Sequence, residues 1–356
     1  MHHWPTALPL VALALLAGAL GLGGAGSVLL AACAAALIGA VIAAVHHAEV
    51  VAHRVGEPFG TLVLAVAVTV IEVALIVSMM RAGGPDTATL PRDTVFAAVM
   101  IICTGVVGLC VLVGGLHHHE QSFQIDGATS SLAALVALAG LSLVLPSFTT
   151  SSPGGTYTLS QLVFAGVSSL VLWMIFVFVQ TVRHRDYFLP PTRQHDEHAH
   201  AAPPGVAAAW ASFGLLLVAL VSVVGLAKQL SPTLEGLVAS AGAPKAVIGI
   251  AIALLVLLPE TWAAVRAARA DRLQTSMNLA LGSALASIGL TIPAVVATAW
   301  WLDLPLELGL LPKDLVLLLL TFIVSGMTLG TGRTTVMQGA VHLVLFAAFL
   351  FLALVP

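Results

Sequence analysis

Long apolar segments alternate with short polar ones over the whole chain. A helix needs about 20 apolar residues to cross the roughly 30 Å hydrocarbon core of a bilayer, and a window of that length finds eleven such segments. They cover residues 6–24, 27–45, 60–80, 94–116, 127–147, 159–181, 206–226, 244–265, 276–300, 312–330 and 335–355. The pattern predicts an all-α polytopic membrane protein with about eleven transmembrane helices.

A polar segment at 183–205 divides these apolar segments into six before it and five after it. It contains prolines, which cannot continue a helix, and many histidines, so we expect a soluble linker. Setting aside an extra N-terminal helix at 1–26 leaves five spans in 27–182 and five in 206–356. Because five is odd, the second copy would enter the membrane from the opposite side, as in the inverted repeats of many secondary transporters.

The lysines and arginines favour a cytoplasmic linker and N-terminus in a multi-pass protein of the inner (plasma) membrane. With that orientation eight of them fall on the inner side and five on the outer side, in agreement with the positive-inside rule. The inner set is Arg54, Arg183, Arg185, Arg193, Arg266, Arg269, Arg272 and Arg333, and the outer set is Arg81, Arg92, Lys228, Lys245 and Lys313.

Composition agrees with a membrane location and excludes other classes. Of 356 residues, 59% are hydrophobic and 8% are charged, whereas soluble domains average about 25% charged. The net charge of −3 gives no basis for a nucleic-acid partner, so lipid and the transported ions are the expected partners. Cys33, Cys103 and Cys110 all lie in apolar segments, and we expect no disulfide, metal cluster or cofactor. The oligomeric state stays open.

Two glutamates stand inside apolar segments, one in each half: Glu72, and Glu260 after Pro259. A carboxylate in the bilayer core costs several kcal/mol, so we expect both to bind the transported cation and protons. Protons and metal ions compete for the same oxygens, which is the physical basis of antiport. Because Ca²⁺ takes about six to eight oxygen ligands, further groups must line the ion path. The polar residues nearest in the pattern are Thr69, Thr104, Asn278, Ser283 and Ser287.

Other polar residues allow two interpretations each. Glu57, at the mouth of the third segment, is a candidate for proton access or a helix cap. His342, inside the last segment, is a candidate proton relay, or it makes a buried hydrogen bond. The remaining histidine clusters suit solvated loops better than metal or proton binding. They are His46 with His53 around Glu49, His117 to His119 before Glu120, and His195, His198 and His200 in the linker.

The chain contains no H-E-x-x-H, G-x-S-x-G or phosphate-binding glycine motif, so we expect no enzyme activity. Two alternatives to antiport remain. One is a passive cation channel on the same repeats, and the other is an intramembrane metal-dependent enzyme that uses His46, Glu49 and His53.

Four segments carry a resemblance to a known family. They are GEPFGTLVLAVAVTVIEVALIVSMM at 56–80, RDTVFAAVMIICTGVVGLCVLVGGLHHHEQSF at 92–123, LPETWAAVRAARADRLQTSMNLALGSALASIGLTIPAV at 258–295 and GTGRTTVMQGAVHLVLFAA at 330–348. They closely resemble the bacterial ChaA-type cation/proton antiporters of the calcium/cation antiporter superfamily. The resemblance implies calcium/proton exchange, with sodium/proton and potassium/proton exchange also attributed to this group. It also implies that two repeat motifs meet at the transport site, with Glu72 and Glu260 as its carboxylates.

The chain departs from the wider superfamily in the residues around these glutamates. The superfamily motifs G-N-x-x-E and G-N-A-A-E carry more polar ligands than Val70-Ile71 and Leu258-Pro259 supply. The linker is rich in histidine where related calcium exchangers often have an acidic loop. From the resemblance we expect a secondary active transporter that exchanges a cytosolic cation for protons by alternating access, with Ca²⁺ as the first choice. The smaller number of polar ligands leaves Na⁺ or K⁺ as alternatives.

Overall fold

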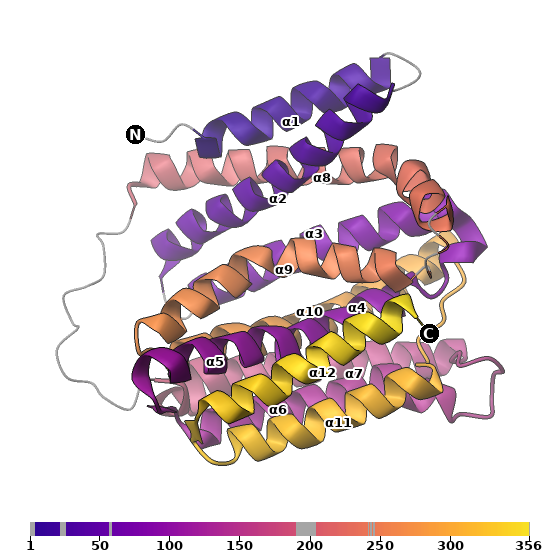
Figure 1. The fold of residues 1–356 in the computed structure, drawn as a ribbon. Coiled ribbons are helices and arrows are strands. Elements are labelled where there is room, and N and C mark those ends of the chain that lie inside the picture. Colours follow the sequence, from indigo (N-terminus) through magenta and orange to yellow (C-terminus); the bar gives the residue numbers. More distant parts are fainter. Residues whose placement is uncertain are drawn as a thin grey trace. The chain divides into compact units, whose positions relative to one another are not determined.

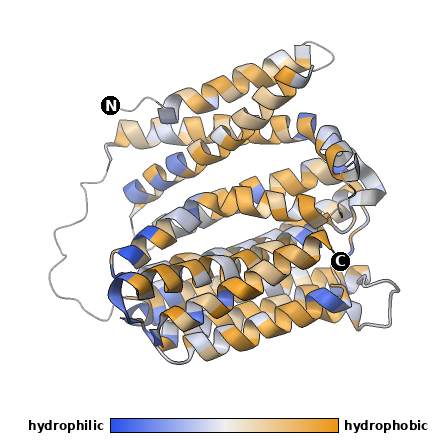
Figure 2. Cartoon of the chain, in the orientation of Figure 1, coloured by the Kyte–Doolittle hydropathy of each residue, from blue (hydrophilic) through white to orange (hydrophobic). Residues whose placement is uncertain are grey.

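The structure is a computed structural model that describes residues 4–21, 26–56, 59–189, 204–240, 242, 244 and 246–355. Most of these residues are helical (Figure 1). Figure 2 shows hydrophobic colours along the helices and hydrophilic colours mainly near their ends. Ten of the described helical segments are long and apolar enough to cross a membrane. Helix α3 (Phe59–Gly83) lies where the sequence predicts an eleventh, and the all-α polytopic fold is confirmed.

The chain forms two compact units, each of which combines segments from both halves of the sequence. Unit 1 covers Met1–Thr87 and His195–Gly242. Its elements are α1 (Trp4–Gly21), α2 (Ser27–Val55), α3, the 3₁₀ turn η1 (Gly84–Thr87) and α8 (Val206–Ser240). Helix α2 packs against α1, α3 and α8. A stripe of buried alanines at spacing four, Ala36, Ala40, Ala44 and Ala48, gives α2 a smooth face for close helix packing.

Unit 2 covers Ala88–Gln194 and Ala243–Pro356. Its first part contains α4 (Leu90–Met100), η2 (Ile101–Val106), α5 (Val107–His118), β1 (Gln121–Ser122), α6 (Ile125–Ala139), η3 (Gly140–Val144), η4 (Leu145–Ser147), α7 (Leu159–Phe178), η5 (Val179–Arg183) and η6 (Arg185–Phe188). Its second part contains α9 (Ala246–Arg269), α10 (Leu273–Leu302), α11 (Pro312–Leu329), β2 (Arg333–Thr334) and α12 (Val336–Leu354). Segments η2, η3 and η5 are π-helical, while η4 and η6 are 3₁₀ turns.

The span from α4 through η2 to α5 forms the core of unit 2. Of the most apolar stretch of this span 89% is buried, a larger share than in any other candidate membrane span in the described chain. Helices α9, α10 and α12 all pack against it. Glycine permits the closest approaches: a Cβ added at Gly249 of α9 would lie 2.9 Å from the backbone of Asp93 and Thr94. One added at Gly108 of α5 would lie 2.8 Å from Cβ of His342.

The loops of unit 2 gather at two ends, in the alternation that the sequence predicts. At one end β1 pairs antiparallel with β2, and Nη1 of Arg333 lies 3.2 Å from Oε1 of Glu120. At the other end the amide of Glu307 donates to the carbonyl of Ala88 at 3.0 Å, and that of Gly309 to Gly155 at 2.8 Å. Loops assigned to the same side of the membrane therefore contact each other. The first end is the one predicted to be cytoplasmic.

Two helices run well past their predicted ends. Helix α8 continues to Ser240, not 226, and α2 continues to Val55, not 45. The predicted ends were wrong because polar residues such as Lys228 and His46 lower the local hydropathy without interrupting the backbone hydrogen bonds. Even Pro232 lies inside α8, since a proline removes one hydrogen bond and need not end a membrane helix.

Candidate cation and proton site

Glu72 lies in the middle of α3 in unit 1 and is 3% exposed. Thr69 lies three residues earlier on the same helical face and is also buried. Ile71, Leu75 and Ile76 beside them are buried apolar side chains. The helix therefore holds a carboxylate and a hydroxyl close together among buried apolar residues of α3, where negative charge is costly.

Glu260 lies on α9 in unit 2 and is half-buried. Pro259 precedes it inside the helix and has no N–H to donate to the carbonyl of Leu255, four residues earlier. Backbone carbonyls released in this way coordinate ions in the interrupted helices of transporters. Helix α9 packs against α4, η2 and α10, so the helices that carry Thr104, Ser283 and Ser287 are its neighbours.

Helix α10 carries three of the predicted ion-path residues. Ser283 and Ser287 share a face; Ser287 is buried and Ser283 is half-buried. Asn278 lies nearer the start of the helix, where Nδ2 donates to the carbonyl of Phe188 at 2.6 Å and Oδ1 accepts from Gln274 Nε2 at 2.9 Å. The bond to Phe188 ties α10 to η6 at the predicted cytoplasmic end, and the bond from Gln274 lies within α10. A place for Asn278 on the ion path stays a prediction.

Thr104 lies in the π-helical segment η2, which is buried throughout. Its hydroxyl donates to the carbonyl of Met100 within the same helix. The π turn changes the backbone bonding, because the N–H of Val107 is directed to the carbonyls of Ile102 and Thr104. Such segments recur at functional sites. The sequence analysis found Thr104 but not the π turn, which carries no distinct letter pattern.

His342 on α12 is fully buried, and both of its ring nitrogens are hydrogen-bonded. Nδ1 lies 2.7 Å from the carbonyl oxygen of Cys103 in η2, and Nε2 lies 3.0 Å from Oγ1 of Thr328 at the end of α11. A carbonyl only accepts, so Nδ1 carries a proton, and when the ring is neutral Nε2 accepts the Thr328 hydroxyl. The buried hydrogen bond expected for His342 is confirmed, and proton relay stays a prediction.

Three other described histidines contact neighbouring segments. His47 Nε2 lies 2.9 Å from the carbonyl of Pro5, and the ring of His46 lies 5.3 Å from that of Trp4, so both contact the start of α1. His118 Nε2 lies 3.0 Å from the carbonyl of Arg269. Within the described chain no group of three or more His, Cys, Asp or Glu residues is placed to hold a metal ion. Glu57 and the linker histidines lie outside the described residues.

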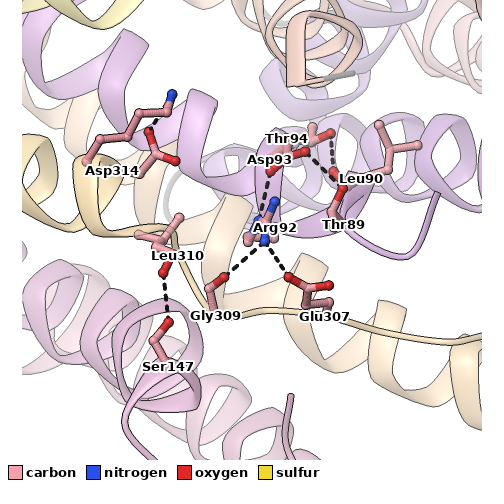
Figure 3. Close-up of polar contacts among 11 residues, drawn as sticks. Thr89, Leu90, Arg92, Asp93, Thr94, Ser147, Glu307, Gly309, Leu310 and Asp314 are labelled. Carbon is pink, nitrogen blue, oxygen red and sulfur yellow. Dashed lines mark hydrogen bonds and ion pairs between the residues drawn. The ribbon is translucent and has the colours of Figure 1, made fainter. Parts of the chain in front are cut away.

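A charged cluster lies at the predicted outer end of unit 2, in a position that the sequence analysis counted only as a loop charge. The Arg92 guanidinium, 6% exposed, lies 2.8 Å from Asp93 Oδ1 and 2.8 Å from Glu307 Oε1, and donates to the carbonyl of Gly309 at 3.0 Å (Figure 3). Ser147 Oγ donates to the carbonyl of Leu310 nearby. These contacts fix the loop before α11 to the start of α4 and to η4.

The family model of the sodium/calcium exchanger protein matches residues 25–182 and 211–355, which is most of the chain. The chain belongs to the sodium/calcium exchanger protein family. The first matched segment contains Glu72 and Thr104, and the second contains Glu260, Ser287 and His342. The gap between them, 183–210, contains the polar linker.

Individual proteins are similar to this chain over most of their length. The chain is 51% identical to the y4hA protein of Sinorhizobium fredii, over 92% of this chain and 89% of that protein. It is 35% identical to the sodium-potassium/proton antiporter ChaA of Escherichia coli, over 88% and 86%. The solved structure of native YfkE matches with a TM-score of 0.74 at 17% identity, covering 99% of this chain and 100% of YfkE, which shows a shared fold.

Proposed function

We propose that this chain is a secondary active antiporter that exchanges a cytosolic cation for protons across the inner membrane by alternating access. One observation carries the proposal: Glu72 is buried in the middle of a long apolar helix, at 3% exposure. Glu260, after Pro259 in α9, is its counterpart in the second half of the sequence. A chain that keeps an ionisable group at this depth uses it, because the energetic cost is several kcal/mol.

The exchange follows from competition at the carboxylates. Glu72 and Glu260 each hold negative charge when deprotonated and lose it when they take up a proton. A bound cation and bound protons therefore exclude each other, and release of one on either side of the membrane permits loading of the other. Thr69, Thr104, Ser283, Ser287 and Asn278 are the proposed supporting oxygens, and Glu57 is the proposed point of proton access.

The choice of cation rests on the oxygen count. Two carboxylates, hydroxyls and a carbonyl of the α9 proline turn suit Ca²⁺, which tolerates irregular geometry. The 35% identity to an antiporter named for sodium and potassium supports Na⁺ and K⁺ as well. We further propose that the linker and N-terminus are cytoplasmic, and that 27–182 and 206–356 are inverted five-helix repeats.

The test uses inverted membrane vesicles with an imposed inside-acid pH gradient and a clamped membrane potential. Addition of Ca²⁺, Na⁺ or K⁺ in turn identifies the substrate as the cation that discharges the gradient. Glu72→Gln and Glu260→Gln are expected to abolish the response at normal membrane abundance. Glu120→Gln makes the same chemical change at a residue whose side chain is 50% exposed, and is expected to retain exchange.

Normal exchange by Glu72→Gln or Glu260→Gln would overturn the site. Accumulation of the labelled cation against its own gradient separates an antiporter from a passive channel, because a channel moves cations only down their gradient. Cation flux without opposite proton movement would replace the antiport proposal with the channel.

A further inference from the structure

We infer that His342 is a positioning residue for cation binding. Its Nδ1–H donates to the carbonyl of Cys103 and so stabilises the π-helical hydrogen bonding of Ile101–Val106. That bonding sets the direction of the Thr104 side chain. The inference rests on the proposed antiport function, because the effect on transport requires Thr104 to line the ion path.

The π turn leaves the Cys103 carbonyl without its regular helical donor. In an α-helix the N–H of Val107 would donate to Cys103, but here it is directed to Ile102 and Thr104. A membrane interior offers no water to replace a missing donor, so a carbonyl there must find another partner in the protein. His342 Nδ1 supplies it at 2.7 Å, from a helix 239 residues further along the chain.

The surrounding packing fixes the ring that makes this bond. Gly108 has no Cβ, which lets α12 approach α5 so closely that an added Cβ would lie 2.8 Å from Cβ of His342. On the other side of the ring Nε2 is held by Thr328 at 3.0 Å. One imidazole thus joins α11, α12 and the π segment, and its full burial keeps water from competing.

The same geometry argues against proton relay. A relay must take a proton at one nitrogen and release it at the other. Nδ1 of His342 faces a backbone carbonyl, which does not take up a proton at neutral pH, and Nε2 faces a hydroxyl. The ring would have to break both bonds to pass a proton on.

Loss of the Nδ1 bond would remove the reason for the π turn. Without the donor to Cys103 the hydrogen bonds of residues 101–107 can change locally, because the N–H of Val107 can then return to the Cys103 carbonyl. Thr104 would then point away from its present direction. Cation affinity should fall, while the proton-carrying carboxylates are untouched.

Three variants separate the possible roles of His342 in the vesicle assay. His342→Ala removes both bonds, and we expect the KM for the cation to rise about tenfold, with the maximal rate and the pH profile nearly unchanged. His342→Asn places an amide N–H near the position of Nδ1, and it should bring KM back to within about threefold of wild type. Thr328→Val removes only the Nε2 partner and should also stay within about threefold.

Two outcomes would overturn the inference. If His342→Asn is as inactive as His342→Ala and the pH profile shifts, His342 carries protons. If KM is the same in all variants and their transport rates fall only in proportion to the amount of folded protein recovered, His342 has a structural role alone.

Hydrogen–deuterium exchange of the whole protein in detergent gives a readout that does not depend on transport. Amides of residues 101–108 should exchange faster in His342→Ala than in wild type, and His342→Asn should restore their protection. Equal exchange in all three proteins would contradict the role of His342 in holding the π segment. If the wild-type protein showed no cation-dependent proton movement, the proposed antiport would be refuted. The hydrogen–deuterium exchange result would still show whether His342 holds the π segment.

Discussion

Nη1 of Arg92 lies 2.8 Å from Oε1 of Glu307, a residue 215 positions later in the chain. The same nitrogen donates to the carbonyl of Gly309, while Nε faces Asp93 (Figure 3). Arg92 stands at the start of α4, the first part of the buried core of unit 2, and Glu307 belongs to the loop before α11. One guanidinium therefore secures the connection between α10 and α11 to the core helix.

Replacing Arg92 should destabilise unit 2 strongly. Arg92→Met keeps the length of the side chain but leaves the Asp93 carboxylate, 12% exposed, without its cation. Breaking a buried ion pair from one side typically costs about 3 kcal/mol. Arg92→Lys should be intermediate, because one ammonium cannot reproduce the three contacts of the planar guanidinium. Thermal unfolding of the purified protein in detergent measures the loss.

A matched control for Arg92→Met is Arg333→Met in the exposed ion pair at the other end of unit 2. The Arg333 side chain is 74% exposed and lies 3.2 Å from Glu120, which is 50% exposed, and a solvated pair of this kind is worth little. Its Tm should stay near wild type. An unchanged Tm for Arg92→Met would show that the cluster does not hold the loop.

The apolar pattern was sufficient to predict the helices, because spanning a bilayer imposes length and composition on a segment. The predicted segment 312–330 is α11, Pro312–Leu329, and 335–355 is α12, Val336–Leu354. The tether from Arg92 to Glu307 could not be predicted in the same way. It joins residues far apart in sequence, and each looks like an ordinary loop charge on its own.

In the candidate site, too, some features could be predicted from the sequence and others could not. Glu72 and Glu260 are visible in the sequence because a carboxylate in an apolar segment is costly wherever the helix packs. The partner of His342 is a backbone carbonyl released by a π turn, and no residue type marks such a carbonyl. Asn278 was grouped with the ion path by residue type, whereas its observed bond to the Phe188 carbonyl follows from tertiary packing.

The close approach of α5 and α12 predicts a large effect from a small substitution. In Gly108→Ala the new Cβ would lie 2.8 Å from Cβ of His342 and 3.1 Å from the backbone nitrogen of Leu343, so α12 must move. Overpacking of this kind costs about 1–3 kcal/mol. Gly214→Ala in α8 meets no atom within 4 Å and should be neutral or stabilising, because alanine favours helix. Equal Tm values for the two variants would contradict the packing.

Tyr157 predicts a pH dependence of stability. Its hydroxyl donates to the carbonyl of Leu141 in the π segment η3 at 2.7 Å, and burial raises the pKa of the phenol above its ordinary value. The folded state therefore keeps the proton where the unfolded chain loses it. The contribution is complete below about pH 10, the pKa of an unfolded tyrosine, and is lost as pH rises through the folded pKa.

Tyr157→Phe tests this contribution. Near pH 8 the variant should be less stable by about 1 kcal/mol, the net value of one hydrogen bond. The gap should narrow as pH rises above about 10, since phenylalanine does not titrate. The other tyrosine, Tyr187, is present in both proteins and cancels in the difference. A gap that stays constant up to strongly alkaline pH would show that Tyr157 does not couple folding to protonation.

The grouping of the unit 2 loops makes the membrane orientation testable with two single substitutions. Ser151 is exposed in the loop between η4 and α7, which is assigned to the outer side, and Ala270 is exposed between α9 and α10, assigned to the cytoplasm. The native cysteines Cys33, Cys103 and Cys110 are buried and should give little background with a membrane-impermeant maleimide.

In intact cells the maleimide should label Ser151→Cys and leave Ala270→Cys unmodified, and in inverted vesicles the pattern should reverse. The physical reason is the excess of arginine on the inner side, eight positive residues against five. Because both loops belong to unit 2 and lie at its opposite ends, their labelling must be complementary if the unit spans the membrane. If both variants were labelled from the same side, the assignment of the spans would be wrong. If Ala270→Cys were labelled in intact cells and Ser151→Cys were not, the orientation would be the opposite one, with the Arg92 cluster in the cytoplasm.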